Sequence, residues 1–248
     1  MTGTPAPYAA AGISILVPVS NEALSVQQTL LQLVAIMRRL GQPYEILVID
    51  DGSTDASRQV IAAVADPALR VITHRRNQGY GAALTHGLRQ ARFPQLVITD
   101  ADGTYPLERI PELLAGLDQH AMVIGARTGR QVHTAAARRL VKWGLHRLAE
   151  RITGRAIPDL NSGLRAMRRA AILPLEPILP QRFSWTSTVT VALLLGGQAV
   201  AFVPIDYHRR QGVSKVHPIR DTLRALGCIL RAAAFGAAQR PGVGQDTV

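Results

Sequence analysis

Two aspartates, Asp100 and Asp102, stand at the end of the apolar run Leu96 to Ile98. Such a run is typical of a strand buried on both faces of a parallel sheet, which would place the acids at its carboxyl end. Residues i and i+2 of an extended chain point to the same side, so both carboxylates can reach one cation. Mg²⁺ and Mn²⁺ bind one or two carboxylates together with substrate phosphates. The spacing therefore predicts a metal and diphosphate site, although an ordinary turn after a strand can carry the same tripeptide.

The composition limits the kinds of partner. The chain has 248 residues, 47% of them hydrophobic, which is enough for the core of one large α/β domain. Its 28 Lys and Arg against 17 Asp and Glu favour anionic partners: phosphorylated substrates, nucleic acid or an anionic membrane surface. Aromatic residues make up only 4% and do not interleave with a basic run, which argues against nucleic acid. Cys228 stands alone, so neither disulfides nor a cysteine zinc site are expected.

The sequence carries no clear targeting or membrane-spanning segment. Residues 1–12 lack the charged and apolar regions of a signal peptide. The longest apolar stretch, Val189 to Val203, is interrupted by Gly196, Gly197 and Gln198 and is shorter than the roughly 20 residues that a spanning helix needs. We therefore expect a cytoplasmic protein with a flexible segment at 1–12 and a disordered tail at 239–248.

Strands and helices that would position the acids alternate along the chain. Apolar runs predict strands over residues 13–18, 45–49, 69–73, 96–98, 122–126 and 199–205, and residues 159–165 are expected to form a turn and a short strand. Amphipathic stretches predict helices over residues 24–40, 56–64, 77–91, 106–117, 134–152 and 186–195. This alternation forms right-handed βαβ units. We therefore predict an α/β fold with a mostly parallel central sheet flanked by helices.

Charged residues also follow other predicted strands. Asp51 follows the second strand and Arg127 follows the fifth. Open α/β sheets bind ligands outside the carboxyl ends of their strands, so these residues are expected near Asp100 and Asp102. Gly79 and Gly81 open the helix after the third strand. They are consistent with an anion-binding helix N-terminus or, equally, with close packing of the chain.

Basic residues dominate three segments of the second half. The helix predicted over residues 134–152 carries Arg138 and Arg139, and the loop from Asp206 contains Arg209 and Lys215, a composition suited to phosphate oxygens. Residues 216–238 form an amphipathic pattern that is too charged to span a bilayer but suited to lying on one. The alternative is that this helix docks on the protein's own core or on a partner subunit.

Six short motifs occur in order along the chain: VPVSNE (17–22), VIDDGS (48–53), DADGTYP (100–106), GAR (125–127), NSGLR (161–165) and GVSK (212–215). In order and spacing they resemble the family 2 glycosyltransferases of the GT-A fold. Among these they resemble the polyprenyl-phosphate sugar synthases related to dolichyl-phosphate mannose synthase. The resemblance implies a GT-A domain over residues 13–215 followed by an interfacial helix over 216–238.

The resemblance also implies roles for particular residues. The base and ribose of a nucleotide-diphosphate sugar, of the GDP-mannose or UDP-glucose type, would contact Pro18, Ser20, Glu22, Ile49 and Asp51, with Ser20 standing where the family usually has tyrosine. Mg²⁺ or Mn²⁺ and the diphosphate would be held by Asp100, Ala101 and Asp102, with Asp102 and Arg127 as the catalytic residues. The acceptor phosphate would contact Arg127, Arg138 and Arg139, and the donor phosphates would contact Arg209 and Lys215.

The acceptor can also be inferred from the residues. Relatives that glycosylate a hydroxyl often use an acid near the helix after the NSG motif, but residues 182–187 contain no carboxylate. A phosphate is already anionic and needs no base, which favours inverting transfer to polyprenyl phosphate, with Asp159 left as a possible base. The resemblance implies peripheral docking on the cytoplasmic face of the membrane, alone or with a separate membrane-protein partner. The alternatives are transfer to a polysaccharide or protein hydroxyl, a nucleotidyltransferase, and a non-catalytic basic binding module.

Overall fold

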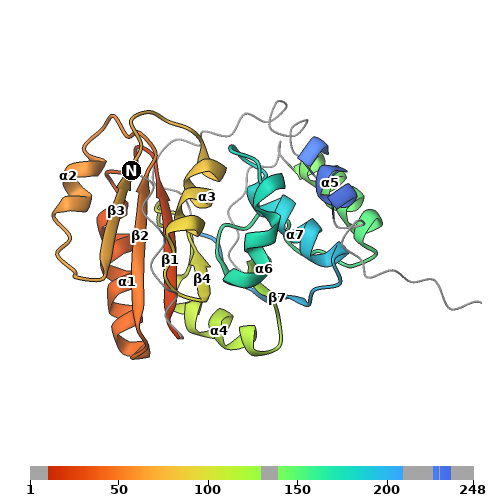
Figure 1. The fold of residues 1–248 in the computed structure, drawn as a ribbon, viewed down its shortest axis with the longest axis horizontal. Coiled ribbons are helices and arrows are strands. Elements are labelled where there is room, and N and C mark those ends of the chain that lie inside the picture. The colour runs from red at the N-terminus through yellow and green to blue at the C-terminus, as the bar shows by residue number, and fades with distance from the viewer. Residues whose placement is uncertain (1–10, 130–138, 209–225, 229, 236–248) are drawn as a thin grey trace, which may run out of the picture.

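A seven-stranded sheet runs through the centre of the computed structural model, which describes residues 11–129, 139–208, 226–228 and 230–235 (Figure 1). The strands are β1 (Ile13–Val19), β2 (Tyr44–Asp50), β3 (Leu69–Thr73), β4 (Gln95–Ile98), β5 (Met122–Ala126), β6 (Arg165–Arg168) and β7 (Val200–Pro204). Their spatial order is β3-β2-β1-β4-β6-β5-β7. Among these strands β6 alone is antiparallel to its neighbours. The predicted α/β fold with a mostly parallel sheet is confirmed.

Helices connect the strands. They are α1 (Val26–Leu40), α2 (Ser57–Ala62), α3 (Tyr80–Gln90), α4 (Ile110–Ala115), α5 (Arg139–Thr153), α6 (Arg169–Ile172) and α7 (Trp185–Leu195). The single helix predicted over residues 106–117 is wrong, because α4 lies between two 3₁₀ turns, Leu107–Arg109 and Gly116–Asp118. Pro111 has no N–H to donate to Leu107, so an α-helix cannot run through this point. The sequence analysis also missed α6 and the 3₁₀ segment Leu173–Ile178 that follows it.

Two apolar layers cover the sheet, one on each face. Leu16 of β1 packs with residues of α3 and α7, whereas Ile15 and Val17 pack with residues of α1 and α4. All three side chains are fully buried. Because neighbouring residues of a strand point to opposite faces, a sheet covered on both sides needs continuous apolar strands. This requirement explains the unbroken apolar runs in the sequence.

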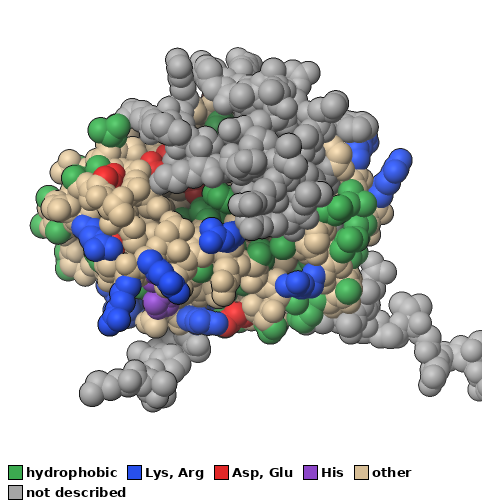
Figure 2. Space-filling model, turned by 90° about the horizontal axis from the view of Figure 1, so that it is seen from above, with side chains coloured by type: hydrophobic (Ala, Val, Ile, Leu, Met, Phe, Trp, Pro, Cys, Tyr) green, Lys and Arg blue, Asp and Glu red, His purple; other side chains and the backbone are tan. Residues whose placement is uncertain are grey.

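The carboxyl ends of β1, β2 and β4 lie at one edge of the sheet. Val19 pairs with Asp50, so β1 and β2 end at the same level, whereas Ile98 at the end of β4 pairs with Leu16, three residues before the end of β1. The N–H of Asp51 donates to the carbonyl of Val19 at 2.8 Å and keeps the first two exits together. Figure 2 views the molecule from the top of Figure 1 and has Lys and Arg side chains spread over the described surface, in keeping with the formal charge of +11.

The described residues near the C-terminus pack partly on the protein itself. Residues 226–228 and 230–235 are helical. Ala232 is fully buried and Phe235 packs against the core, whereas Leu226 and Leu230 are exposed. One side of this described segment therefore packs on the protein's own core. Such packing was the alternative to membrane docking for the helix predicted over residues 216–238. None of the helices in the described part of the chain combines the length and the apolar character needed to cross a bilayer.

Candidate active site

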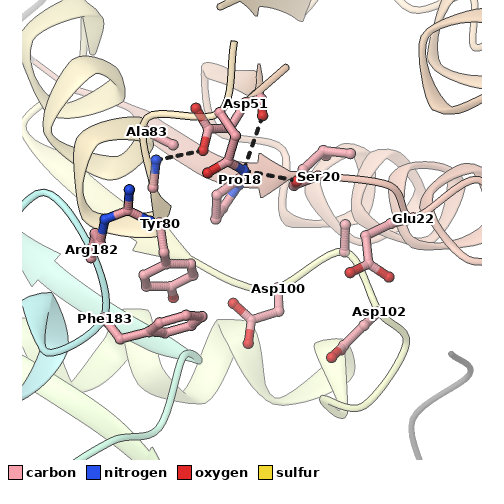
Figure 3. Close-up of a pocket in the computed structure, with 14 residues that line it drawn as sticks. Pro18, Ser20, Glu22, Asp51, Tyr80, Ala83, Asp100, Asp102, Arg182 and Phe183 are labelled. Atoms are coloured by element: carbon pink, nitrogen blue, oxygen red, sulfur yellow. Dashed lines mark hydrogen bonds between the residues drawn. The ribbon is translucent and has the colours of Figure 1, made fainter. Parts of the chain in front are cut away.

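A pocket of about 320 Å³ opens at the carboxyl edge of the sheet (Figure 3). It contains residues from the ends of β1, β2 and β4, which the sequence placed at this edge. Seven of the predicted site residues line it: Pro18, Ser20, Glu22, Asp51, Asp100, Ala101 and Asp102. The other lining residues are Val19, Asn77, Gly79, Tyr80, Ala83, Arg182 and Phe183. The pocket therefore lies between the segments that follow β1, β2 and β4, the start of α3 and the loop before α7.

Asp100 and Asp102 reach the pocket from the turn after β4. Asp102 is 4% exposed, and its Oδ1 accepts hydrogen bonds from the backbone N–H and the hydroxyl of Thr104 at 3.1 and 2.6 Å. These bonds fix the orientation of the carboxylate. Asp100 is half-buried and lies close to the backbone of Gly163. Two carboxylates at one pocket wall make a partial ligand set for a hard divalent cation.

The NSGLR motif packs against the carboxylate of Asp100 through the backbone of Gly163. A Cβ placed on Gly163 would lie 2.8 Å from Asp100 Oδ2, so only glycine permits this approach. The N–H of Gly163 donates to the hydroxyl of Tyr105 at 2.6 Å. Arg165 is fully buried and donates to the carbonyls of Ser162 and Leu160 at 2.7 and 2.9 Å. These bonds fix the loop formed by the motif in contact with Asp100, one of the two candidate metal ligands.

Asp51 lines the pocket, but its carboxylate also anchors the chain around it. Oδ1 accepts from the N–H of Gln78 and interacts with Nδ1 of His74, both at 2.8 Å, and Oδ2 accepts from the N–H of Gly79 at 2.7 Å. A carboxylate with three such contacts is rigid. Asp51 therefore fixes the segment that leads into α3 as well as facing the predicted nucleotide site.

The glycines at the start of α3 serve close packing. A Cβ on Gly81 would lie 1.9 Å from the carbonyl oxygen of Pro180, and one on Gly79 would lie 2.6 Å from that of Gln181. The N–H of Ala82 donates to the backbone carbonyl oxygen of Gln181 at 2.6 Å. Several N–H groups of this helix start are therefore bonded within the protein. The packing interpretation of Gly79 and Gly81 is favoured over the anion-binding one.

Other predicted site residues lie elsewhere. Ile49 is fully buried in the core, and a Cβ on Gly87 of α3 would lie 2.9 Å from its Cδ1, so the side chain does not reach the pocket. Arg139 begins α5, but its side chain is outside the described part of the chain. Arg138, Arg209 and Lys215 also lie outside the described residues.

Arg127 does not line the pocket and is paired with Asp159. Its Nε and Nη2 donate to the two carboxylate oxygens at 2.6 and 2.9 Å, and its guanidinium lies 5.1 Å from the ring centre of Tyr207. Both members of the ion pair are largely buried. Burial alone would raise the pKa of Asp159, but the hydrogen bonds and charge of Arg127 outweigh it and lower the pKa to about 2. Such a carboxylate is a weak base at neutral pH.

The ion pair between Arg127 and Asp159 can be tested through the dependence of the free energy of unfolding on pH. Because the pKa of Asp159 lies below the ordinary value of 3.8, its contribution to folding is complete above about pH 4 and is lost as the pH falls through about 2. The shift corresponds to about 2 kcal/mol at neutral pH. We expect Asp159→Asn to lower the free energy of unfolding at pH 7 by at least that amount. Urea unfolding of both proteins between pH 7 and 2.5 would measure it.

The difference in free energy of unfolding between the wild type and Asp159→Asn reports on Asp159, because the two proteins share the other titrating groups. It should be largest at pH 7 and should shrink as the pH approaches 2.5. A difference that stays constant over this range would mean that Asp159 is not held as a low-pKa carboxylate.

Tyr80, Arg182 and Phe183 line the pocket but belong to none of the predicted site motifs. Tyr80 lies in the glycine-rich segment that opens α3, and Arg182 and Phe183 lie in the carboxylate-free segment 182–187. The structure brings the two segments together through the contacts of Gly81 and Ala82. No local pattern in the sequence indicates that contact.

Comparison with known proteins places the chain among glycosyltransferases. The model of glycosyl transferase family 2 matches residues 14–173. The chain is similar to the undecaprenyl-phosphate 4-deoxy-4-formamido-L-arabinose transferase of Pseudomonas fluorescens, with 32% identity over 217 residues covering 86% of this chain and 63% of the relative. The enzyme of that name from Pectobacterium atrosepticum is 34% identical over 161 residues, covering 63% and 49%. This chain thus spans about half to two thirds of the relatives' length.

A solved structure with the same architecture is glucosyl-3-phosphoglycerate synthase from Mycobacterium tuberculosis in complex with Mn²⁺, UDP and phosphoglyceric acid. It superposes with a TM-score of 0.71 at 19% identity, covering 95% of this chain and 81% of the other. That likeness establishes a GT-A-like fold. Because the family model covers well over half of the chain, the protein belongs to glycosyl transferase family 2.

Proposed function

We propose that this protein transfers a sugar from a nucleotide-diphosphate sugar to polyprenyl phosphate with inversion at the anomeric carbon. The observation that carries the proposal is the convergence of Pro18, Asp51, Asp100 and Asp102 on one pocket at the carboxyl edge of the sheet. Pro18 and Asp51 would face the nucleoside, with Ser20 and Glu22 beside them, and the two later acids would face the diphosphate. The donor would be of the GDP-mannose or UDP-glucose type.

A divalent ion, Mg²⁺ or Mn²⁺, fits the donor set of this pocket. Asp100 and Asp102 offer hard oxygen ligands, and no group of three or more His, Cys, Asp or Glu among the described residues forms a complete cage. Mg²⁺ is typically held in this way, by one or two carboxylates and the phosphates of its substrate. When bound, the ion would neutralise charge on the departing diphosphate. Asp102, fixed by Thr104, would keep its carboxylate aimed at the ion.

A phosphate acceptor suits the side of the pocket formed by the loop before α7. That loop contributes Arg182 and Phe183 to the wall, and neither can act as a general base for a hydroxyl. Asp159 is bound to Arg127 and is a weak base. A lipid phosphate needs no deprotonation, and both relatives described above are named for undecaprenyl phosphate. We therefore favour polyprenyl phosphate over a polysaccharide or protein hydroxyl.

Arginines would complete the site around the phosphates. Asp159 engages two N–H donors of Arg127, and the guanidinium has further donors that can bind an acceptor phosphate oxygen. Arg138 and Arg139 would assist it. The described chain after β7 reaches His208, whose N–H donates to the carbonyl of Thr104 at 2.9 Å. This bond places His208 beside the turn of Asp102. Arg209 and Lys215, which lie outside the described residues, are proposed to contact the donor phosphates.

A lipid acceptor implies work at a membrane surface. We propose peripheral docking on the cytoplasmic face, aided by the net charge of +11 and the exposed Leu226 and Leu230, alone or with a membrane-protein partner. The direct test of the function has two stages. Thermal-shift screening of GDP- and UDP-sugars with Mn²⁺ would identify the donor, and the radiolabelled donor would then be incubated with undecaprenyl phosphate. We expect the label to pass into the organic phase only when enzyme, metal and lipid are all present, and label that stays aqueous would refute the lipid acceptor.

A further inference from the structure

Tyr80 and Phe183 form an aromatic wall in the pocket. Their ring centres lie 6.1 Å apart and their planes are inclined by only 11°, so the two rings are stacked. Both residues line the pocket, and Figure 3 places them beside Asp100. The side chain of Phe183 is 36% exposed, although a phenylalanine in a folded protein is usually buried. A supported aromatic face that stays open inside a pocket is suited to contact with a ligand.

The backbone on both sides of Phe183 is held firmly. Before it, the segment at Pro180 and Gln181 packs against the glycines at the start of α3. After it, Ser184 has a φ of 88°, in the left-handed region that favours glycine. Strained backbone of this kind persists where surrounding contacts enforce it, and it clusters at ligand sites. Trp185 then anchors α7, with its indole N–H donating to Thr85 at 3.1 Å. The aromatic wall is therefore a rigid feature.

We propose that the exposed face of Phe183, backed by Tyr80, binds the sugar ring of the donor by stacking against the ring's C–H face. The inference rests on the proposed function and specifies its sugar subsite. Aromatic faces carry partial negative charge and attract the polarised hydrogens of a pyranose ring. The ligand class is therefore a nucleotide sugar whose pyranose presents an apolar face to the wall.

The position of the aromatic wall distinguishes the sugar from the base. The sugar is bonded directly to the diphosphate, so it must lie next to the groups that hold the diphosphate, whereas the ribose separates the base from them. Tyr80 stacks on Phe183 and interacts with Asp100, and in the view of Figure 3 Pro18, Ser20 and Asp51 lie on the other side of Tyr80 from these two residues. The aromatic wall therefore lies on the side of the pocket where the donor sugar is expected.

Two ligands that differ only in the sugar test this inference. Calorimetry with Mn²⁺ would compare the nucleotide sugar found by the thermal-shift screen with the matching nucleoside diphosphate. We expect Phe183→Ala to weaken binding of the nucleotide sugar roughly five- to tenfold and to change binding of the nucleoside diphosphate less than about twofold. Phe183→Trp, which keeps an aromatic face, should restore most of the loss. Leu31→Ala truncates an exposed apolar side chain on α1 that does not line the pocket; it is the matched control and should change binding of neither ligand.

The outcomes separate the inference from the proposed function. Equal weakening of both ligands by Phe183→Ala would assign the wall to the nucleoside, and unchanged donor binding with a raised KM for the lipid would assign it to the acceptor. Either result overturns the sugar subsite alone. Failure of the wild-type protein to bind any of the nucleotides would overturn the proposed function and the subsite together.

Discussion

Asp102→Asn is expected to lower kcat for sugar transfer by about 10²–10³-fold while leaving the fold intact. The substitution removes one negative charge from the proposed metal site, so charge on the departing diphosphate is neutralised less well. Asparagine keeps a side-chain oxygen that can accept the two hydrogen bonds from Thr104, so the turn after β4 should persist. Steady-state assays over a range of Mn²⁺ concentrations, with thermal unfolding of the same samples, would measure both effects.

Asp118→Asn is the matched control for this substitution. Asp118 is exposed in the 3₁₀ turn Gly116–Asp118 and is not among the pocket residues. The same change of charge there should leave kcat and the metal dependence as they are. If Asp102→Asn retained a kcat within about threefold of the wild type at every metal concentration, Asp102 would have no role in holding a catalytic ion.

Gly163→Ala is expected to lower kcat by about 10²-fold, although the residue contributes no side chain to the pocket. The added Cβ would lie 2.8 Å from Oδ2 and 3.0 Å from Oδ1 of Asp100, closer than carbon and oxygen atoms normally approach. The bond from Gly163 to Tyr105 and the contacts of Arg165 hold the loop, so the carboxylate must move instead. Kinetic assays should give a fall in kcat and a rise in the Mn²⁺ concentration needed for half-maximal rate.

Gly144→Ala controls for the loss of a glycine. Gly144 lies in α5, and a Cβ added there would meet no atom within 4 Å. This substitution should preserve activity and raise helix stability slightly. If Gly163→Ala lowered only the melting temperature and left kcat and metal dependence unchanged, then the loop would not position Asp100.

Much of the sheet edge could be predicted from the sequence because its signals are local. Each strand that is buried on both faces has a continuous apolar run, and the chemistry begins where the run stops, at Pro18, Asp51 and Asp100. The strand β6 has no such apolar run, and the turn and short strand predicted over residues 159–165 overlaps it only at Arg165. Arg165 and Arg168 stand at its two ends, and a short segment with charged ends does not resemble a central strand. The burial of Arg165 in β6 depends on the carbonyl of Thr186 and the hydroxyl of Thr190, which accept hydrogen bonds from its guanidinium and lie 21 and 25 residues further along the chain.

The rest of the site depends on contacts between segments that are distant in sequence. Nothing near Arg127 in the chain indicates that Asp159 will pair with it, and nothing near Tyr80 indicates that Phe183 will stack on it. Ile49 was assigned to the nucleotide by resemblance, but the packing of Gly87 buries it. Alternation along a strand gives the face on which a side chain lies, but not which helix covers that face.

The reversed direction of β6 has a mechanical consequence. Main-chain hydrogen bonds join β6 to β4 on one side and to β5 on the other, with Arg165 level with both Ile98 and Ile124. The strand whose end carries Asp100 and the strand whose end carries Arg127 are therefore fastened to the same central piece of backbone. Main-chain bonding on both sides of β6 opposes sliding of β4 and β5 past one another. Under the roles proposed for Asp100 and Arg127, the strand ends that would hold the departing and the incoming phosphate stay two strand spacings apart, and adjustment to different substrates would fall to the loops at the carboxyl edge of the sheet.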